Sequence, residues 1–102
     1  MKSLLALATG TAMLTSSIAG AASDELARRY ACSACHAVDT KLVGPAFKEI
    51  AAKYREDQAA PAKLAEKVKK GSQGVWGNIP MPPNPTVPDA DVNALVSWIL
   101  SQ

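Results

Sequence analysis

Two cysteines and a histidine stand together in this chain, at Cys32, Cys35 and His36, in the spacing C-x-x-C-H. Two thiols three residues apart on a helical turn can reach the two vinyl groups of one porphyrin and form thioether bonds. The adjacent histidine is then delivered under the iron. The motif therefore predicts covalent attachment of one haem, with His36 as an axial ligand of its iron.

Three other chemistries use a similar set of residues. A thioredoxin-like redox motif needs strands alternating with helices around its C-x-x-C, and the sequence has no strand pattern. A structural zinc site needs four ligands, whereas the motif supplies three and no further soft donor is obvious. A plain disulfide between Cys32 and Cys35 stays open for an exported protein, but it closes too short a loop to add much stability and gives His36 no role.

The N-terminus has the features of a secretory signal peptide. Lys2 makes a short basic start, residues 3–18 carry no charge, and residues 19–21 (Ala-Gly-Ala) fit a cleavage site of small residues. We expect residues 1–21 to be removed and residues 22–102 to form one small domain. A retained membrane anchor is the alternative for so uncharged a stretch.

Charge and size restrict the function further. The full chain has 11 Lys and Arg against 9 Asp and Glu, a net charge of +2, and removal of Lys2 leaves ten against nine. A chain so nearly balanced, with no basic stripe, is not a nucleic-acid binder. A core of about 80 residues rarely supplies more than about 3–5 kcal/mol, so the apolar faces of a bound porphyrin would complete it.

The second axial ligand can be inferred because the chain contains few side chains that commonly bind haem iron. With His36 assigned and the leader removed, Met81 is the only side chain of the usual haem-ligand types besides lysine and tyrosine. Prolines at positions 80, 82 and 83 surround it, so this segment has little conformational freedom to lose when the sulfur binds iron. A lone methionine that only fills a gap in the core is the alternative.

Helical periodicity and turn residues predict an all-α fold of three or four short helices. The expected helices are residues 23–36, with a cap at position 23, and residues 47–54, 61–70 and 89–101. Three glycines and five prolines exclude regular structure from residues 71–88. Trp76, Ile79 and Met81 favour an ordered functional loop there, because a solvated linker has little use for such side chains.

With these motifs in place, the chain resembles the bacterial class I cytochromes c, most closely the small cytochrome c-551 (cytochrome c8) type. The resemblance extends over essentially all of residues 22–102. It rests on CSACH (32–36), DTKLVGP (39–45), GSQGVWG (71–77), IPMPPN (79–84) and WILSQ (98–102). It implies the class I cytochrome c fold, wrapped around one covalently bound haem c, with the long Gly/Pro-rich loop carrying the methionine ligand.

The resemblance also implies roles for residues around His36 and Met81. The carbonyl at the Pro45 position accepts a hydrogen bond from the ligand histidine. The Asn84 position bonds the region of the methionine sulfur, and the Trp76 position reaches a haem propionate. Such contacts fix the orientation of the ligands and tune the iron.

The chain departs from the family pattern at Ala31, at Lys67, at Asn78 and in an extra residue among positions 85–88; the last two affect local loop geometry, not ligation. Ala31 stands where many relatives have glycine before the first cysteine, and we expect this to be tolerated because both residues are small. Lys67 stands where close relatives often carry arginine. It keeps a positive charge near a propionate but loses the bidentate geometry of a guanidinium.

Ligation by His36 and Met81 indicates an electron carrier rather than an enzyme, because it raises the reduction potential and leaves no open position for a substrate. A catalytic or gas-sensing haem protein with an open site is the alternative, and Met81 distinguishes the two. The resemblance implies a soluble periplasmic carrier between a respiratory donor such as the bc1-type complex and a terminal oxidase or reductase such as nitrite reductase.

The expected partners are these redox proteins, which would dock transiently with a monomer; we expect no nucleic acid and no membrane insertion after cleavage. Redox interfaces of this kind combine an apolar centre with a charged rim. Val43 and Ile79 are candidates for the centre. The candidates for the rim are Lys41, Lys67, Lys69 and Lys70.

Overall fold

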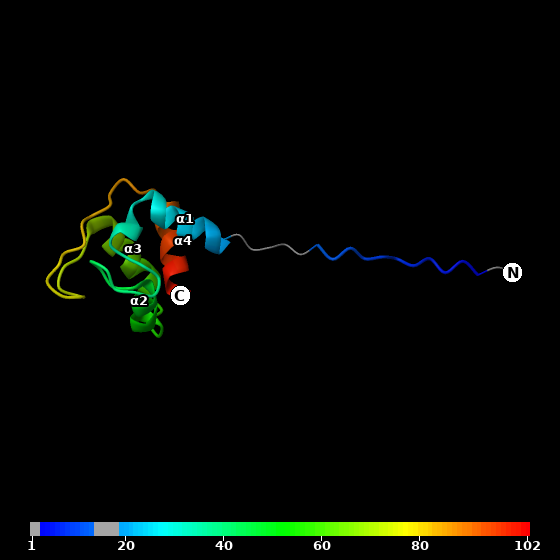
Figure 1. Cartoon of the computed structure of the whole chain (residues 1–102), viewed down its shortest axis with the longest axis horizontal. Helices are drawn as coiled ribbons and strands as arrows, with labels where there is room; N and C mark the ends of the chain where they lie inside the picture. Colours follow the sequence, from blue (N-terminus) through cyan, green and yellow to red (C-terminus); the bar gives the residue numbers. More distant parts are fainter. Residues whose placement is uncertain (1–2, 14–18) are drawn as a thin grey trace.

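The computed structural model describes residues 3–13 and 19–102, and the helices in these ranges are joined by loops without a β-strand. In chain order the elements are α1 (Ala19–Arg29), the short 3₁₀ helix η1 (Cys32–Ala34), α2 (Phe47–Tyr54), α3 (Ala60–Lys70) and α4 (Asp89–Leu100) (Figure 1). The predicted all-α class and the four helical regions are confirmed.

The C-terminal helix α4 is the element on which the other helices pack. It contacts α1, α2 and α3. Val92, Leu95 and Val96 recur at helical spacing and are all buried, so one face of α4 runs through the core. The core cluster consists of Phe47, Ile50, Leu64, Val87, Val92 and Val96.

Helices α2 and α3 end close to where their sequences predict. Phe47, Ile50 and Ala51 form the buried face of α2. Pro61 occupies the first turn of α3, where its missing N–H costs nothing. Three lysines lie in the last turn of α3, where cations suit the helix dipole, and Gly71 ends the helix with φ of 79°.

Helix α1 differs from the prediction at both ends. It begins at Ala19 rather than at residue 23, because three of the four residues upstream of Ser23 are alanine, the residue with the highest helix propensity. Ser23, the predicted cap, is therefore a buried residue inside the helix. At the other end Ala31 has φ of 59° and ψ of 20°, a left-handed conformation that stops the α-helix. The cysteine motif consequently starts on the separate turn η1.

A side-chain contact connects this turn to the rest of the fold. Tyr30, directly before it, donates a hydrogen bond from Oη to the carboxylate of Asp91 on α4. That hydrogen bond raises the pKa of the Tyr30 hydroxyl above its usual value, so the group stays protonated as a donor. The turn that carries the cysteines is thereby fixed against the central helix.

Lys69 fastens α3 to the start of α4. Its Nζ donates to the carbonyl of Val87 at 2.8 Å and pairs with Asp89 at 3.0 Å. It does not line the cavity described below, and its place in a docking rim stays a prediction.

Part of the predicted leader is described by the structure. Residues 3–13 have no regular structure and are exposed, and they extend away from the helices (Figure 1). Residues 1–2 and 14–18 lie outside the described residues. Within the described ranges, no helix is both long enough and apolar enough to cross a membrane.

Replacing Ala31 with glycine should raise the free energy of unfolding by about 0.5–1 kcal/mol, because glycine adopts the left-handed conformation without a Cβ clash. Chemical denaturation of the purified protein measures the change. Ala52→Gly is the matched control, since Ala52 is exposed inside α2, and it should lower stability by about 1 kcal/mol. Destabilisation by Ala31→Gly would contradict the strain assigned to this position.

Candidate haem-binding site

A cavity of about 350 Å³ lies between the motif segment, α2, α3 and the loop after α3. The four predicted attachment and ligand residues, Cys32, Cys35, His36 and Met81, all line it. Most of the other lining side chains are apolar, including Ile50 and other members of the core cluster. The structure therefore brings the predicted residues together on one apolar cavity.

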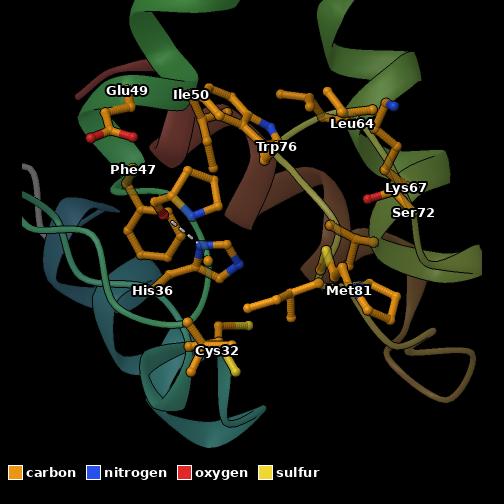
Figure 2. A pocket seen from close by; sticks show the side chains of 18 of the residues that line it. Cys32, His36, Phe47, Glu49, Ile50, Leu64, Lys67, Ser72, Trp76 and Met81 are labelled. Atoms are coloured by element: carbon orange, nitrogen blue, oxygen red, sulfur yellow. Dashed lines mark hydrogen bonds between the residues drawn. The ribbon is translucent and has the colours of Figure 1, made fainter.

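His36 and Met81 lie on opposite sides of this cavity, and Cys32 lies at one end between them (Figure 2). His36 comes from the segment after η1, and Met81 comes from the loop between α3 and α4. A planar group between the two side chains would have an imidazole on one face and a thioether on the other.

The hydrogen bond of His36 determines which ring nitrogen faces the cavity as a ligand. Nδ1 lies 2.7 Å from the carbonyl oxygen of Pro45, which is buried and can only accept. Nδ1 therefore carries the proton and donates, and the neutral ring keeps the lone pair on Nε2. A neutral imidazole with a free Nε2 is the form that binds a metal.

Two further contacts fix the plane of the His36 ring. Phe47 stacks on it, with ring centroids 5.2 Å apart and an interplanar angle of 19°. On Gly44, a Cβ would lie 2.6 Å from Cε1 of His36, so only glycine leaves room for the ring. The Gly44 amide also donates to the carbonyl of Cys35 at 2.8 Å, which keeps this backbone close to the motif. No signal in the sequence shows that Gly44 leaves room for the His36 ring.

The two thiols belong to one turn of backbone. The amides of Cys35 and His36 both donate to the carbonyl of Cys32, at 3.1 and 2.9 Å. No disulfide joins Cys32 and Cys35, so both side chains are available for covalent attachment, and burial raises the pKa of the Cys32 thiol. Within residues 3–13 and 19–102, no three His, Cys, Asp or Glu side chains gather as metal ligands, which gives the zinc alternative no support.

Met81 is held through its backbone. It forms an antiparallel bridge with Ser72, in which the two residues exchange hydrogen bonds of 3.1 and 2.8 Å. Gly71 permits this approach, because a Cβ there would lie 2.6 Å from the carbonyl oxygen of Met81. From the sequence alone Gly71 is only one of the glycines that exclude regular structure from residues 71–88, and no signal in the sequence shows that residues 72 and 81 pair.

Asn84 is placed differently from the expectation. Its side-chain amide donates to the carbonyls of Val68 and Pro82, both at 3.2 Å, and its backbone N–H donates to Val68 at 3.0 Å. These hydrogen bonds attach the chain that follows Met81 to α3. Asn84 thus supports the position of the methionine through the backbone, and its hydrogen bonds in the structure do not include the sulfur.

Trp76 and Lys67 both line the cavity at its partly exposed edge. The Trp76 side chain lies at the end of the cavity away from Cys32 (Figure 2). Lys67 is half-buried, on the last turn of α3. Their contacts with the haem propionates, which the resemblance implies, remain a prediction.

These residues fit a covalently bound haem. The turn presents two free thiols to an apolar cavity, His36 presents an unprotonated Nε2, and a thioether faces it from the opposite wall. Thiols, imidazole and thioether are the groups that attach and ligate such a cofactor.

Comparisons with known proteins agree. The family model for cytochrome c matches residues 21–102. The chain is 55% identical over 91 residues to cytochrome c-552 of Nitrosomonas europaea, covering 89% of this chain and 87% of that protein. It is 50% identical over 96 residues to cytochrome c-551 of Pseudomonas aeruginosa, covering 94% and 90%. The crystal structure of the Nitrosomonas europaea cytochrome c552 matches with a TM-score of 0.74 at 58% identity, over 76% of this chain and 96% of that one.

The helical fold and the cavity with its C-x-x-C-H turn define a small class I haem protein. The chain belongs to the cytochrome c family, and its cofactor is covalently attached haem c. The resemblance to the cytochrome c-551 type, drawn from the sequence, is confirmed.

Gly71→Ala should destabilise the haem-loaded protein by more than 2 kcal/mol, because a Cβ meets the Met81 carbonyl and φ is positive. Gly74→Ala is the matched control: it also has positive φ, but a Cβ there meets nothing within 4 Å. It should cost about 1 kcal/mol from backbone strain alone. Denaturant unfolding of both variants measures the difference, and equal losses would show that the bridge to Met81 does not depend on Gly71.

Proposed function

We propose that this protein is a periplasmic one-electron carrier in which Cys32 and Cys35 hold the porphyrin and His36 and Met81 ligate its iron. When bound, the haem supplies the iron that takes up and gives back one electron. The observation that carries the proposal is the placement of His36 and Met81 on opposite walls of one apolar cavity, each fixed by hydrogen bonds.

The chain's own residues keep the site rigid. His36 is held by Pro45 and Phe47, and Met81 is held by Ser72 at the base of its loop. Ligands that stay in place when the charge of the iron changes suit electron transfer. Two strong axial ligands also leave no position for a substrate, which supports a carrier over an enzyme.

The cavity mouth supports transient docking of redox partners. Large apolar side chains that are normally buried are exposed there: Leu42, Val43, Val75, Trp76 and Ile79. Lys41 lines the same mouth, and Lys70 lies in a groove that shares Lys67 with the cavity. An apolar centre with cations beside it fits a small interface with an acidic partner. We propose that the electron donor is a bc1-type complex and that the acceptor is a terminal oxidase or reductase such as nitrite reductase. We also propose that the protein docks with them as a monomer.

Export is the third part of the proposal. The apolar side chains of Leu4, Leu5, Leu7 and Met13 are more than four-fifths exposed and belong to no part of the core. A leader of this kind can be removed without loss of packing. Protein recovered from a periplasmic extract should have the mass of residues 22–102 with one haem, and a mass that includes residues 1–21 would contradict removal of the leader.

Met81→Ala should keep the covalent haem but open the sixth position of the iron. We expect loss of the weak red absorption band of sulfur–iron ligation, a lower reduction potential and new binding of carbon monoxide or cyanide. Ile79→Ala, in the same loop, is the control and should keep the band. An unchanged spectrum in Met81→Ala would refute the ligand assignment and favour a site that is open in the native protein.

Reversal of Lys41 and Lys70 to glutamate should slow electron transfer to an acidic partner several-fold at low salt. The difference should shrink as ionic strength rises, because salt screens exposed charges. Stopped-flow mixing with candidate partners measures the rate. Arg29→Glu combined with Arg55→Glu makes the same charge change at two exposed residues that line neither the cavity nor the groove, and it should have a smaller effect. If neither the charge reversals nor the salt concentration changes the rate, docking depends on the apolar side chains alone and the prediction is wrong.

A further inference from the structure

The tip of the loop that carries Met81 has few attachments to the rest of the protein. Ser72 and Met81 close the base of the loop through their two hydrogen bonds. Among the hydrogen bonds of the described residues, none involves residues 73–80, and all eight are exposed. The wall of the cavity that faces His36 therefore needs some other contact to keep it closed.

Lys53 supplies such a contact from the last turn of α2. Its ammonium lies 5.6 Å from the centroid of the Trp76 ring, on the loop, and 5.9 Å from the centroid of its neighbour Tyr54. Both distances are within the range at which a cation is attracted to an aromatic face. The side chain thus connects α2, which carries Phe47 against His36, to the loop, which carries Met81.

We infer that Lys53 is a positioning residue that holds the Met81 loop against α2 and so keeps the mouth of the haem cavity closed. The inference deepens the proposed function and rests on it in one respect, because the consequence for the iron requires Met81 to be its ligand. The effect on the loop itself does not depend on that ligation.

The contact leaves the other role of Trp76 intact. A cation over the ring face uses the π-system, whereas the indole N–H lies at the ring edge and remains available for a propionate. By fixing the orientation of the Trp76 ring, Lys53 would also direct its N–H toward the propionate. Lys48, on the same helix, makes no such contact: it pairs with Asp39 and does not line the cavity.

Hydrogen exchange of the haem-loaded protein, read by NMR at the amides of Ser72 and Met81, tests the inference, because these two hydrogen-bonded amides close the base of the loop whose tip Lys53 contacts. Lys53→Met removes the charge and keeps most of the unbranched apolar stem, and exchange of the Ser72 and Met81 amides should accelerate about two- to fivefold. Lys53→Arg should restore the native rate, because guanidinium also binds aromatic faces. Lys48→Met is the matched control for loss of one charge on α2 and should leave the rate unchanged.

A double-mutant cycle identifies the partner of Lys53. In a Trp76→Leu background the Lys53→Met change should have no further effect on exchange, because the ring is already absent. Native exchange in Lys53→Met, equal acceleration by Lys48→Met, or additive effects in the cycle would each overturn the inference.

The sulfur–iron band keeps this result separate from the ligand assignment. If the native ferric protein shows the band, Lys53→Met should also accelerate the replacement of Met81 by added imidazole. If the native protein lacks the band, the proposed ligation fails, while the exchange rates still decide whether Lys53 holds the loop.

Discussion

The hydrogen bond from Nδ1 of His36 to the carbonyl of Pro45 is the interaction on which the site depends most. It places the proton on one nitrogen and leaves the lone pair on the other. Gly44 and Phe47 then confine the ring from two sides. Because Phe47 is also a core residue and packs edge-on against Trp98 of α4, the His36 ring is coupled to the centre of the helical packing.

The opposite wall is built by different means. Met81 lies in a segment without helix or strand, and its position comes from backbone contacts to Ser72 and from the amide of Asn84, which attaches the following chain to α3. One proposed ligand, His36, is thus fixed by a packed ring, and the other, Met81, by the closure of a loop. The second arrangement has fewer buried contacts, so we expect local opening to begin on the methionine side.

The sequence predicts most of this site because its chemistry depends on scarce residues. One histidine beside two cysteines and one methionine among prolines could be recognised without a structure, and helical periodicity located α2, α3 and α4. The close approach of Gly71 to the Met81 carbonyl and the fit of Gly44 against His36 could not be predicted, because both depend on segments that only tertiary folding brings together. The small size of Ala31 does not explain why glycine suits this position. The left-handed backbone conformation does, and it could not be predicted from the residue type.

The start of α1 has a consequence for maturation. The helix begins at Ala19, so cleavage after residue 21 would divide its first turn and place a free ammonium group at the positive end of the helix dipole. Asp24, which pairs with Arg28 at 2.9 Å in the full chain, would then lie within the first turn of the shortened helix. The carboxylates of Asp24 and Glu25 would offset that new charge. The mature terminus would therefore be stabilised by acidic residues that are already present in the precursor.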